Sequence, residues 1–267
     1  MFWSEKVVLV TGGSGGLGCA IAAAFARAGA QVAIVGRDGA RLEKAAATLR
    51  ADAPDRVLAI TADVTRDADV ERMVAETTSR CGRIDVLVNN VGRSTRGEIL
   101  AVSPHEIAEL MEVNLYTAVR CTRAAMPQLL AHRGHVVNIG SLASKAAARY
   151  LGAYPASKSA LAAYTQQLRL ELEPQGLHVL LVCPGPLARE DAGERYDEQA
   201  AHLPESARRP GGGVKVRGID PSDLARRIVA ACQRRKKEIV VPAKARLLFA
   251  IAQLSPTLGD WLVRRMT

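Results

Sequence analysis

The sequence predicts a doubly wound α/β domain, in which helices cover both faces of one seven-stranded parallel sheet. Short apolar runs, often β-branched, alternate along the 267 residues with longer amphipathic stretches rich in Ala, Leu, Glu and Arg. This alternation is the pattern of repeated βαβ units. The runs are apolar nearly throughout, as expected for strands covered on both faces. A glycine-rich turn, TGGSGGLG, follows the first run and begins the first helix.

The predicted strands are short and recur along the chain. They lie at residues 7–10, 31–35, 57–60, 84–88, 135–139, 177–182 and 238–241. Helices are predicted between them at residues 17–28, 38–50, 67–80, 103–130, 153–173 and 221–234. Asp or Ser begins several of these stretches and Gly or Pro follows their ends, which is typical of helix caps.

We find no repeat or linker that divides the chain, so residues 1–267 are expected to form a single domain, a size that open α/β sheets reach. Two segments depart from the alternating pattern. Residues 184–220 contain P-G-P, R-R-P and G-G-G, and a connection of this length predicts a lid or binding loop. Residues 243–267 form a basic, partly apolar tail whose apolar runs are too short to span a bilayer.

Composition restricts the class of protein. A chain with 48% hydrophobic and 24% charged residues is typical of a globular protein with a large core, and is neither disordered nor fibrous. The five cysteines are widely spaced, without a Cys/His group of metal-ligand spacing, so reduced thiols and no metal site are expected. The N-terminus reaches an apolar strand within about six residues, too early for an export signal, and a cytoplasmic location is expected.

The formal net charge of +9 comes from the last quarter of the chain, because residues 203–267 hold 14 Lys and Arg against 5 Asp and Glu. No nucleic-acid recognition motif and no interleaving of aromatic with basic residues accompanies this charge. A nucleic-acid partner is therefore not expected.

The glycine-rich turn fits two dinucleotide-binding patterns. Gly13, Gly15 and Gly18 fit G-x-G-x-x-G, whereas Gly12, Gly16 and Gly18 fit T-G-x-x-x-G-x-G. In either register, glycine lets the backbone approach a pyrophosphate closely, and the following helix N-terminus presents unpaired N–H groups. Tight packing of the helix is the competing explanation for so many glycines.

A Tyr-x-x-x-Lys pair helps to decide the register. Tyr154 and Lys158 form the only such pair in the chain, and their spacing places phenol and ammonium on one helix face. Other residues follow strand ends or lie in the long helix. They are Asn90 and Gly92 after the fourth strand, Asn114, Ser141 after the fifth strand, and Pro184 and Gly185 after the sixth.

With this set of motifs, the sequence resembles the short-chain dehydrogenase/reductase family, in its subgroup with a core of about 250 residues. The resemblance runs from about residue 6 to residue 241. It implies a Rossmann-type domain, a nicotinamide cofactor, interconversion of an alcohol and a carbonyl, and a homodimer or homotetramer. It also selects the second register, so that Gly13 and Gly15 would only add flexibility beside Ser14.

The resemblance further implies individual roles. Tyr154 is the acid/base, Lys158 bonds the nicotinamide ribose, Ser141 donates a hydrogen bond to the substrate oxygen, and Asn114 holds a water in the proton relay. A tyrosine can do this work if its pKa falls from about 10, and we expect Lys158 and the oxidised nicotinamide to lower it. The expected cofactor contacts are Gly12, Ser14, Gly16, Leu17, Gly18, Arg37, Asp63, Val64, Asn90, Gly92, Tyr154, Lys158, Pro184, Gly185 and Leu187.

The end of the second predicted strand favours NADP(H) over NAD(H). A carboxylate there would accept the adenosine ribose hydroxyls, whereas an arginine would pair with a 2′-phosphate. Gly36 occupies that place and Arg37 follows it. Asp38 lies two residues beyond the position where the carboxylate is expected, and is better placed as the N-cap of the next helix.

A hydrophobic or anionic carbonyl or alcohol substrate, such as a lipid-like or acyl compound, is expected. Its walls would come from the residues after Gly92, from residues 143–151 and from the lid. Four arginines have two possible roles: Arg93, Arg96, Arg149 and Arg189. They either line an entrance for an anion or are solvated surface residues, and for each arginine considered alone the surface role is favoured. Arg189 also stands where the family often has Thr.

The tail allows three interpretations. Basic residues flank apolar helical stretches that carry Phe249 and Trp261, the pattern of a helix lying on anionic lipid at the inner face of a membrane. A cover over a hydrophobic pocket and a subunit interface fit as well, and these two together are favoured.

A second class of function also stays open, a dinucleotide-sensing or scaffold protein without turnover. The intact Asn114, Ser141, Tyr154 and Lys158 argue against it.

Overall fold

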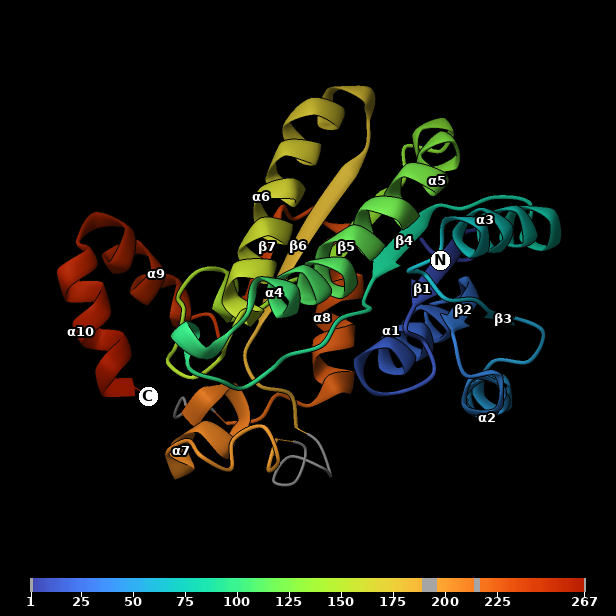
Figure 1. The fold of residues 1–267 in the computed structure, drawn as a ribbon. Helices are drawn as coiled ribbons and strands as arrows, with labels where there is room; N and C mark the ends of the chain where they lie inside the picture. The colour runs from blue at the N-terminus through green and yellow to red at the C-terminus, as the bar shows by residue number, and fades with distance from the viewer. Residues whose placement is uncertain (1, 189–195, 214–216, 267) are drawn as a thin grey trace.

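The computed structural model describes residues 2–188, 196–213 and 217–266. Seven strands form one parallel sheet in the order β3-β2-β1-β4-β5-β6-β7 (Figure 1). They are β1 (Val7–Thr11), β2 (Gln31–Gly36), β3 (Val57–Thr61), β4 (Val86–Asn89), β5 (His135–Ile139), β6 (His178–Pro184) and β7 (Glu238–Val241). The predicted parallel sheet is confirmed, with every strand within about two residues of its predicted ends.

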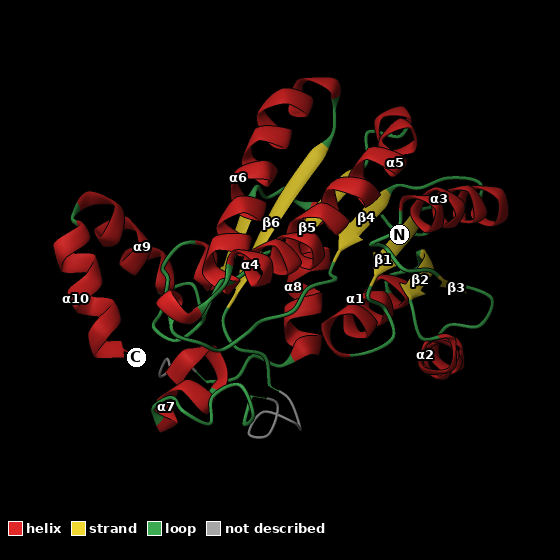
Figure 2. Ribbon diagram, in the orientation of Figure 1, coloured by secondary structure: helices red, strands yellow, loops and turns green. Residues whose placement is uncertain are grey.

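Helices lie between the strands, and two more follow the last strand (Figure 2). They are α1 (Gly16–Arg27), α2 (Gly39–Asp52), α3 (Asp67–Cys81), α4 (Pro104–Met111), α5 (Thr117–Ala131), α6 (Tyr154–Leu172), α7 (Glu205–Arg208), α8 (Pro221–Gln233), α9 (Ala245–Leu254) and α10 (Pro256–Met266). Asp38 caps α2 as predicted, since its carboxylate accepts a hydrogen bond from the Arg41 N–H at 3.0 Å. Ser103 and Glu106 form a capping box at the start of α4.

The predicted helix at residues 103–130 contains an interruption that its periodicity did not predict. Between α4 and α5 the chain forms a π-helical segment, η2 (Glu112–Tyr116). A π-helical turn holds more residues than an α-helical turn, so it shifts the faces of the helix on either side. Asn114 lies in this segment and is only 1% exposed.

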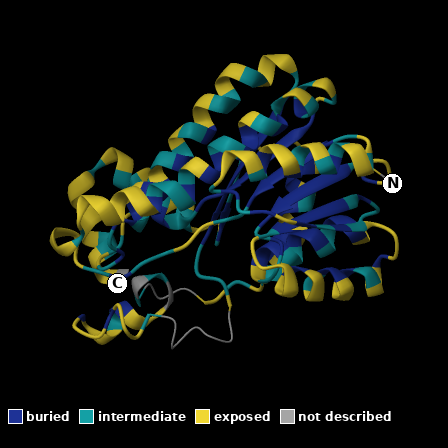
Figure 3. Cartoon of the chain, turned by 45° about the vertical axis from the view of Figure 1, so that its right-hand side comes forward, coloured by how far each residue is buried: buried dark blue, intermediate teal, exposed yellow. Residues whose placement is uncertain are grey.

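Apolar side chains fill both faces of the sheet, and the outer faces of the helices are exposed (Figure 3). Val8 and Val10 of β1 pack with α1, α2 and α8, whereas Leu9 packs with α3 and α5 on the opposite face. Successive strand residues point to opposite faces, so a strand with helices on both sides must be apolar throughout. This explains the continuous apolar runs in the sequence.

Candidate active site

The sheet order reverses direction between β1 and β4, which is where open α/β sheets bind ligands, outside the carboxyl ends of the strands. The loops after these two strands are tied together. The Asn90 side-chain amide donates to the carbonyl oxygens of Thr11 and Gly12, both at 3.2 Å. The Thr11 hydroxyl accepts from the Asn90 N–H at 3.1 Å. Asn90 therefore braces the glycine-rich turn, and its partner Thr11 is the threonine of the T-G-x-x-x-G-x-G pattern.

The glycine-rich turn needs glycine at defined positions. Gly12 and Gly16 have left-handed backbones, with φ of +66° and +54°, which side chains rarely adopt. A Cβ on Gly18 would lie 2.1 Å from the Gly12 carbonyl oxygen, whereas one on Gly16 would meet nothing within 4 Å. These are the glycines of the second register, and the open space beside Gly16 leaves room for a phosphate group.

The sequence-based expectation that Gly13 only adds flexibility is wrong. A Cβ at this position would lie 2.7 Å from the Cβ of Ile34 in β2. Because Ile34 is fully buried, neither side could yield easily. Gly13 is therefore required by packing against the neighbouring strand.

Ser141, Tyr154 and Lys158 come together at the carboxyl end of β5 and the start of α6. The Ser141 side chain hydrogen-bonds the Tyr154 phenol, and the Lys158 ammonium donates to the Ile139 carbonyl oxygen at 2.8 Å. Lys158 is 5% exposed, and burial lowers its pKa to about 8. The Tyr154 phenol and the Ser141 hydroxyl are therefore in contact, and Lys158 lies one turn further along α6, bonded to the end of β5.

The Tyr154 pKa differs in direction from the sequence prediction. Burial raises the pKa of the phenol, and the hydrogen bond from Ser141 opposes that rise only in part. The reason is that burial removes the water that would solvate a phenolate. Of the protein charges that act on the phenol, Tyr196 and Cys183 raise its pKa and Arg96 lowers it. Without the nicotinamide, the net shift of the Tyr154 pKa is therefore upward, and Lys158 is not among its causes.

Asn114 faces the same site from the π-helical segment. Its amide donates to the Arg93 carbonyl oxygen and to the Ser157 hydroxyl, both at 2.9 Å, and its oxygen accepts from the Arg93 N–H at 2.8 Å. Ser157 in turn donates to the Tyr154 carbonyl oxygen at 2.8 Å. Ser157 thus links Asn114 to the first turn of α6. Apart from its place inside the Tyr-x-x-x-Lys spacing, no sequence pattern marks Ser157 as part of the site.

Gly92 lies against both Asn114 and Lys158. A Cβ on Gly92 would be 2.8 Å from the Asn114 oxygen and 3.1 Å from the Lys158 nitrogen. The absence of a side chain at position 92 therefore lets both polar groups occupy one small region beside the loop after β4.

Three basic or polar side chains gather at the end of β2. A Cβ on Gly36 would be 3.4 Å from the Ser14 hydroxyl, and one on Gly15 would be 3.6 Å from an Arg41 guanidinium nitrogen. Arg37 is exposed, and its charge helps lower the pKa of Asp63, whose main cause is a hydrogen bond from the Thr65 N–H. Arg37 is a predicted cofactor contact, whereas Arg41, which lies in α2 after the Asp38 N-cap, was not predicted.

The remaining predicted contacts lie at the same edge of the sheet. Val64 is buried just after β3, and the Gly185 N–H donates to the Val241 carbonyl oxygen at 2.8 Å. Leu187 pairs with Ile219 in a short parallel bridge, which joins the two ends of the 184–220 segment. Arg189 lies outside the described residues.

The predicted entrance arginines have different environments. Arg93 is exposed and pairs with Glu109 at 3.0 Å, and Arg149 lies 5.8 Å from the centre of the Tyr150 ring. Arg96, in contrast, is only 7% exposed. The favoured description of Arg96 as a solvated surface residue is therefore wrong, because its guanidinium is used inside the protein.

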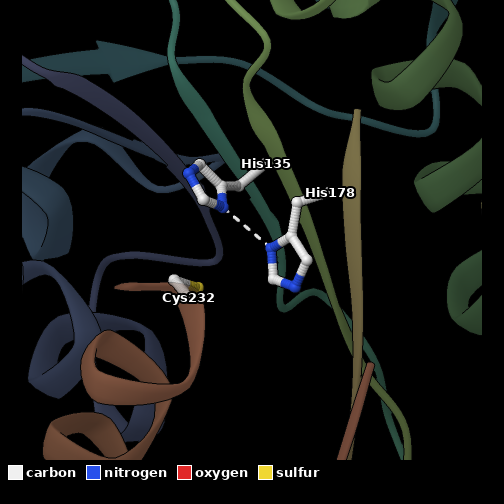
Figure 4. Close-up of side chains that lie close together, drawn as sticks. All are labelled: His135, His178 and Cys232. Carbon is white, nitrogen blue, oxygen red and sulfur yellow. Dashed lines mark hydrogen bonds between the residues drawn. The ribbon is translucent and has the colours of Figure 1, made fainter. Parts of the chain in front are cut away.

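The structure also brings together three potential metal ligands that the sequence left unconnected. His135, His178 and Cys232 are buried, and their ligand atoms lie within 4.8 Å of one another in the described part of the chain (Figure 4). The two Nδ1 atoms share a 2.8 Å hydrogen bond, and His178 Nε2 bonds the Lys236 carbonyl oxygen at 2.8 Å. A carbonyl only accepts, so His178 Nε2 carries its proton and His135 donates through Nδ1. This pair connects the amino ends of β5 and β6, at the edge opposite the glycine-rich turn.

The chain matches the family model for short chain dehydrogenases over residues 6–200. The chain belongs to the short-chain dehydrogenase family. A ketoacyl reductase, HetN, from Nostoc sp. is 32% identical, over 97% of this chain and 88% of that protein. The crystal structure of L-sorbose reductase from Gluconobacter frateurii, complexed with NADPH and L-sorbose, has a TM-score of 0.78 at 26% identity, covering 89% of this chain and 96% of that one. The 3-ketoacyl-(acyl-carrier-protein) reductase from Brucella melitensis, complexed with NADH, has a TM-score of 0.73 at 27% identity, covering 88% and 96%.

This short-chain dehydrogenase is therefore an NAD(P)-dependent oxidoreductase, as its motifs predict. Relatives with either nicotinamide dinucleotide are similar in structure, so the comparisons leave the choice between the two to the local residues. The matched range ends at residue 200 and does not reach α9 and α10. Among the described helices, none combines the length and apolar character that crossing a membrane demands.

Proposed function

We propose that this short-chain dehydrogenase uses NADP(H) to interconvert a ketone and a secondary alcohol. One observation carries the proposal, the hydrogen bond from Ser141 to the Tyr154 phenol beside the buried Lys158 ammonium. A carbonyl that accepts hydride develops negative charge on oxygen, and this charge needs both a hydrogen-bond donor and a proton. Ser141 and Tyr154 offer these two groups side by side.

The residues around the crevice fit a dinucleotide. Gly12 and Gly18 let the turn pack closely, and Gly16 is open at the N-terminus of α1, where unpaired N–H groups favour a pyrophosphate. When bound, the reduced nicotinamide supplies the hydride that the carbonyl carbon accepts. Lys158 would hold the nicotinamide ribose, while Asp63, Val64, Pro184, Gly185 and Leu187 line the same edge.

Tyr154 is the proton donor in ketone reduction. Its raised pKa keeps the phenol protonated near neutral pH, which is the state that a proton donor needs. The phenol gives its proton to the substrate oxygen while Ser141 donates a hydrogen bond to the same atom. Lys158 then returns a proton to the Tyr154 phenolate, and Asn114, which lies with Lys158 beside Gly92, would hold a water that relays this proton.

Local charge supports NADP(H). Arg37 directly follows Gly36 and Arg41 lies beside Gly15, where the adenosine ribose of a dinucleotide would lie, and no acidic side chain occupies position 36. Guanidinium groups pair strongly with phosphate oxygens. A 2′-phosphate would therefore find two cationic partners here.

The substrate is a hydrophobic, acyl-like ketone. Support comes from the name of the Nostoc relative, a ketoacyl reductase. The test is a substrate screen that follows consumption of NADPH, with a 3-ketoacyl thioester, a simple aliphatic ketone and L-sorbose. We expect turnover of the thioester, and turnover of L-sorbose alone would contradict this substrate class.

The same screen with Tyr154→Phe separates an enzyme from a cofactor sensor. An enzyme loses turnover in the variant and keeps nucleotide binding, because the phenyl ring fills the same space. Nucleotide binding without turnover in both proteins, across all ketones, would support the sensor instead.

The C-terminal hairpin formed by α9 and α10 lies on an anionic membrane surface. Phe249 packs against the cluster that holds Leu181, Cys183 and Val240, so the inner side of α9 covers the β7 edge of the sheet. On the outside, Leu247 and Leu254 are 68% and 87% exposed. The hairpin extends away from the rest of the molecule (Figure 1). Four basic residues accompany these leucines: Lys244, Arg246, Arg264 and Arg265.

Charge favours lipid over self-association through this hairpin. Two copies meeting face to face would bring the basic residues of both hairpins together, with only Asp260 to oppose them in each. Vesicle co-sedimentation with and without residues 243–267, using anionic and neutral lipids, tests the proposal. Equal pelleting of the two proteins would overturn the membrane proposal. In a separate experiment, light scattering checks the expected homodimer or homotetramer.

A further inference from the structure

Arg96 lies in the loop after β4 and joins two segments that are distant in the sequence. Its guanidinium donates to the carbonyl oxygens of Ala207 at 2.7 Å, Arg209 at 3.2 Å and Thr95 at 2.8 Å. Ala207 and Arg209 are at the end of α7, where helical carbonyls have no partner within the helix. A buried arginine thus supplies the donors that this short helix needs.

The contacts of Arg96 extend to other parts of residues 196–209, which we call the lid segment. The guanidinium carbon lies 3.7 Å from the centre of the Tyr196 ring, within the range of a cation–π interaction. The Arg96 N–H donates to the Gln199 side chain at 3.1 Å, and the Tyr196 hydroxyl bonds the Ser94 hydroxyl. Arg96 and its neighbours therefore hold both ends of the lid segment.

The same loop is bonded to the chain just before Tyr154. The Gly97 N–H donates to the Tyr150 carbonyl oxygen and the Gly152 N–H donates to the Gly97 carbonyl oxygen, both at 3.1 Å. Tyr150 also packs against Ala200, Leu203 and Ala207 of the lid segment. The lid segment, the Arg96 loop and the approach to Tyr154 thus form one connected unit.

We propose that Arg96 is a positioning residue, which holds the lid segment in place and keeps a buried positive charge in the loop that is bonded to the approach to Tyr154. The proposal rests on the proposed function for its link to catalysis. The lid contact itself depends only on the hydrogen bonds and the ring contact above. A lysine could keep the charge, but it has no planar fork with which to bond several carbonyl oxygens at once.

The experiment compares Arg96→Lys and Arg96→Met with the wild type and with Arg208→Met, which changes an exposed arginine of α7. Hydrogen exchange measured by mass spectrometry reports the lid segment without any substrate. Both Arg96 variants should speed amide exchange across residues 196–209 by about tenfold or more, and Arg208→Met should not. Unchanged exchange in Arg96→Met would overturn the lid role, whatever the enzyme does.

The pH profile of alcohol oxidation tests the charge. Oxidation requires Tyr154 to accept a proton, so its rate rises as the phenol ionises. Removing the Arg96 charge should move the midpoint upward by about half a pH unit or more in Arg96→Met, while Arg96→Lys keeps the wild-type midpoint. Equal midpoints in the wild type and Arg96→Met, or equal shifts in both Arg96 variants, would overturn the role of the charge. A wild type without turnover would instead count against the proposed function.

Discussion

Gly18 faces the carbonyl oxygen of Gly12 so closely that a Cβ on Gly18 would lie 2.1 Å from it. The obstacle is backbone, so a side-chain rotation cannot relieve it. Gly18→Ala should therefore lower the free energy of unfolding by about 2 kcal/mol or more, measured by urea denaturation. Gly15→Ala is the control, because its Cβ would meet only the flexible end of Arg41 at 3.6 Å. Equal losses in the two variants would contradict the packing argument.

Gly92→Ala should reduce turnover more than it reduces stability. Its Cβ would displace the Asn114 oxygen and the Lys158 nitrogen, which would lie at 2.8 and 3.1 Å. Because catalytic groups tolerate little misplacement, we expect kcat to fall at least about tenfold. Steady-state kinetics and a melting curve check this, and an unchanged kcat would show that the two groups need no exact placement.

Tyr154→Phe should lower kcat for ketone reduction by about 10²–10⁴-fold, the usual contribution of a general acid. Nucleotide affinity, measured by fluorescence titration, should change little because the ring remains. Since burial raises the Tyr154 pKa, the wild-type reductase should keep its full rate through neutral pH and lose it only as alkaline pH removes the phenolic proton. A rate that already falls between pH 6 and 8 (a range about the ordinary histidine pKa) would indicate another proton donor.

Arg41→Ala should change the preference between the two nucleotides. If Arg37 and Arg41 bind a 2′-phosphate, the KM for NADPH should rise about tenfold or more while the KM for NADH stays nearly constant. Arg80→Ala, in an exposed ion pair with Glu76 on α3, is the matched control. A parallel change for both nucleotides would remove Arg41 from the phosphate site.

The His135 and His178 pair should make the protein sensitive to acid. Burial, followed by the neighbouring His178, lowers the His135 pKa to about 3, below its ordinary value of about 6.5. The unfolded chain then binds more protons than the folded one between these values, so stability decreases as pH falls from about 6.5 to about 3. His135→Asn should show a shallower dependence of unfolding free energy on pH in this range. Parallel curves for the variant and the wild type would exclude the pair as the cause.

The positions of the strands and of most site residues followed from the sequence alone. An apolar run covered by helices on both faces leaves a clear signal, and parallel strands present their carboxyl ends at one edge. For that reason residues after separate strands, such as Asn90 and Ser141, could be assigned to one crevice. The Tyr154 and Lys158 spacing is similarly local, because one helical turn fixes it.

Tertiary structure decided what depends on packing between distant segments. It turned Asn114 inward through a π-helical segment, buried Arg96 against the lid segment, placed Arg41 beside Gly15 and brought His135 to His178. It also set the direction of the Tyr154 pKa shift, since desolvation by the whole fold exceeds the effect of the Ser141 hydrogen bond. Spacing along a chain fixes which groups share a strand or a helix turn, but the burial of a charge depends on every element that surrounds it.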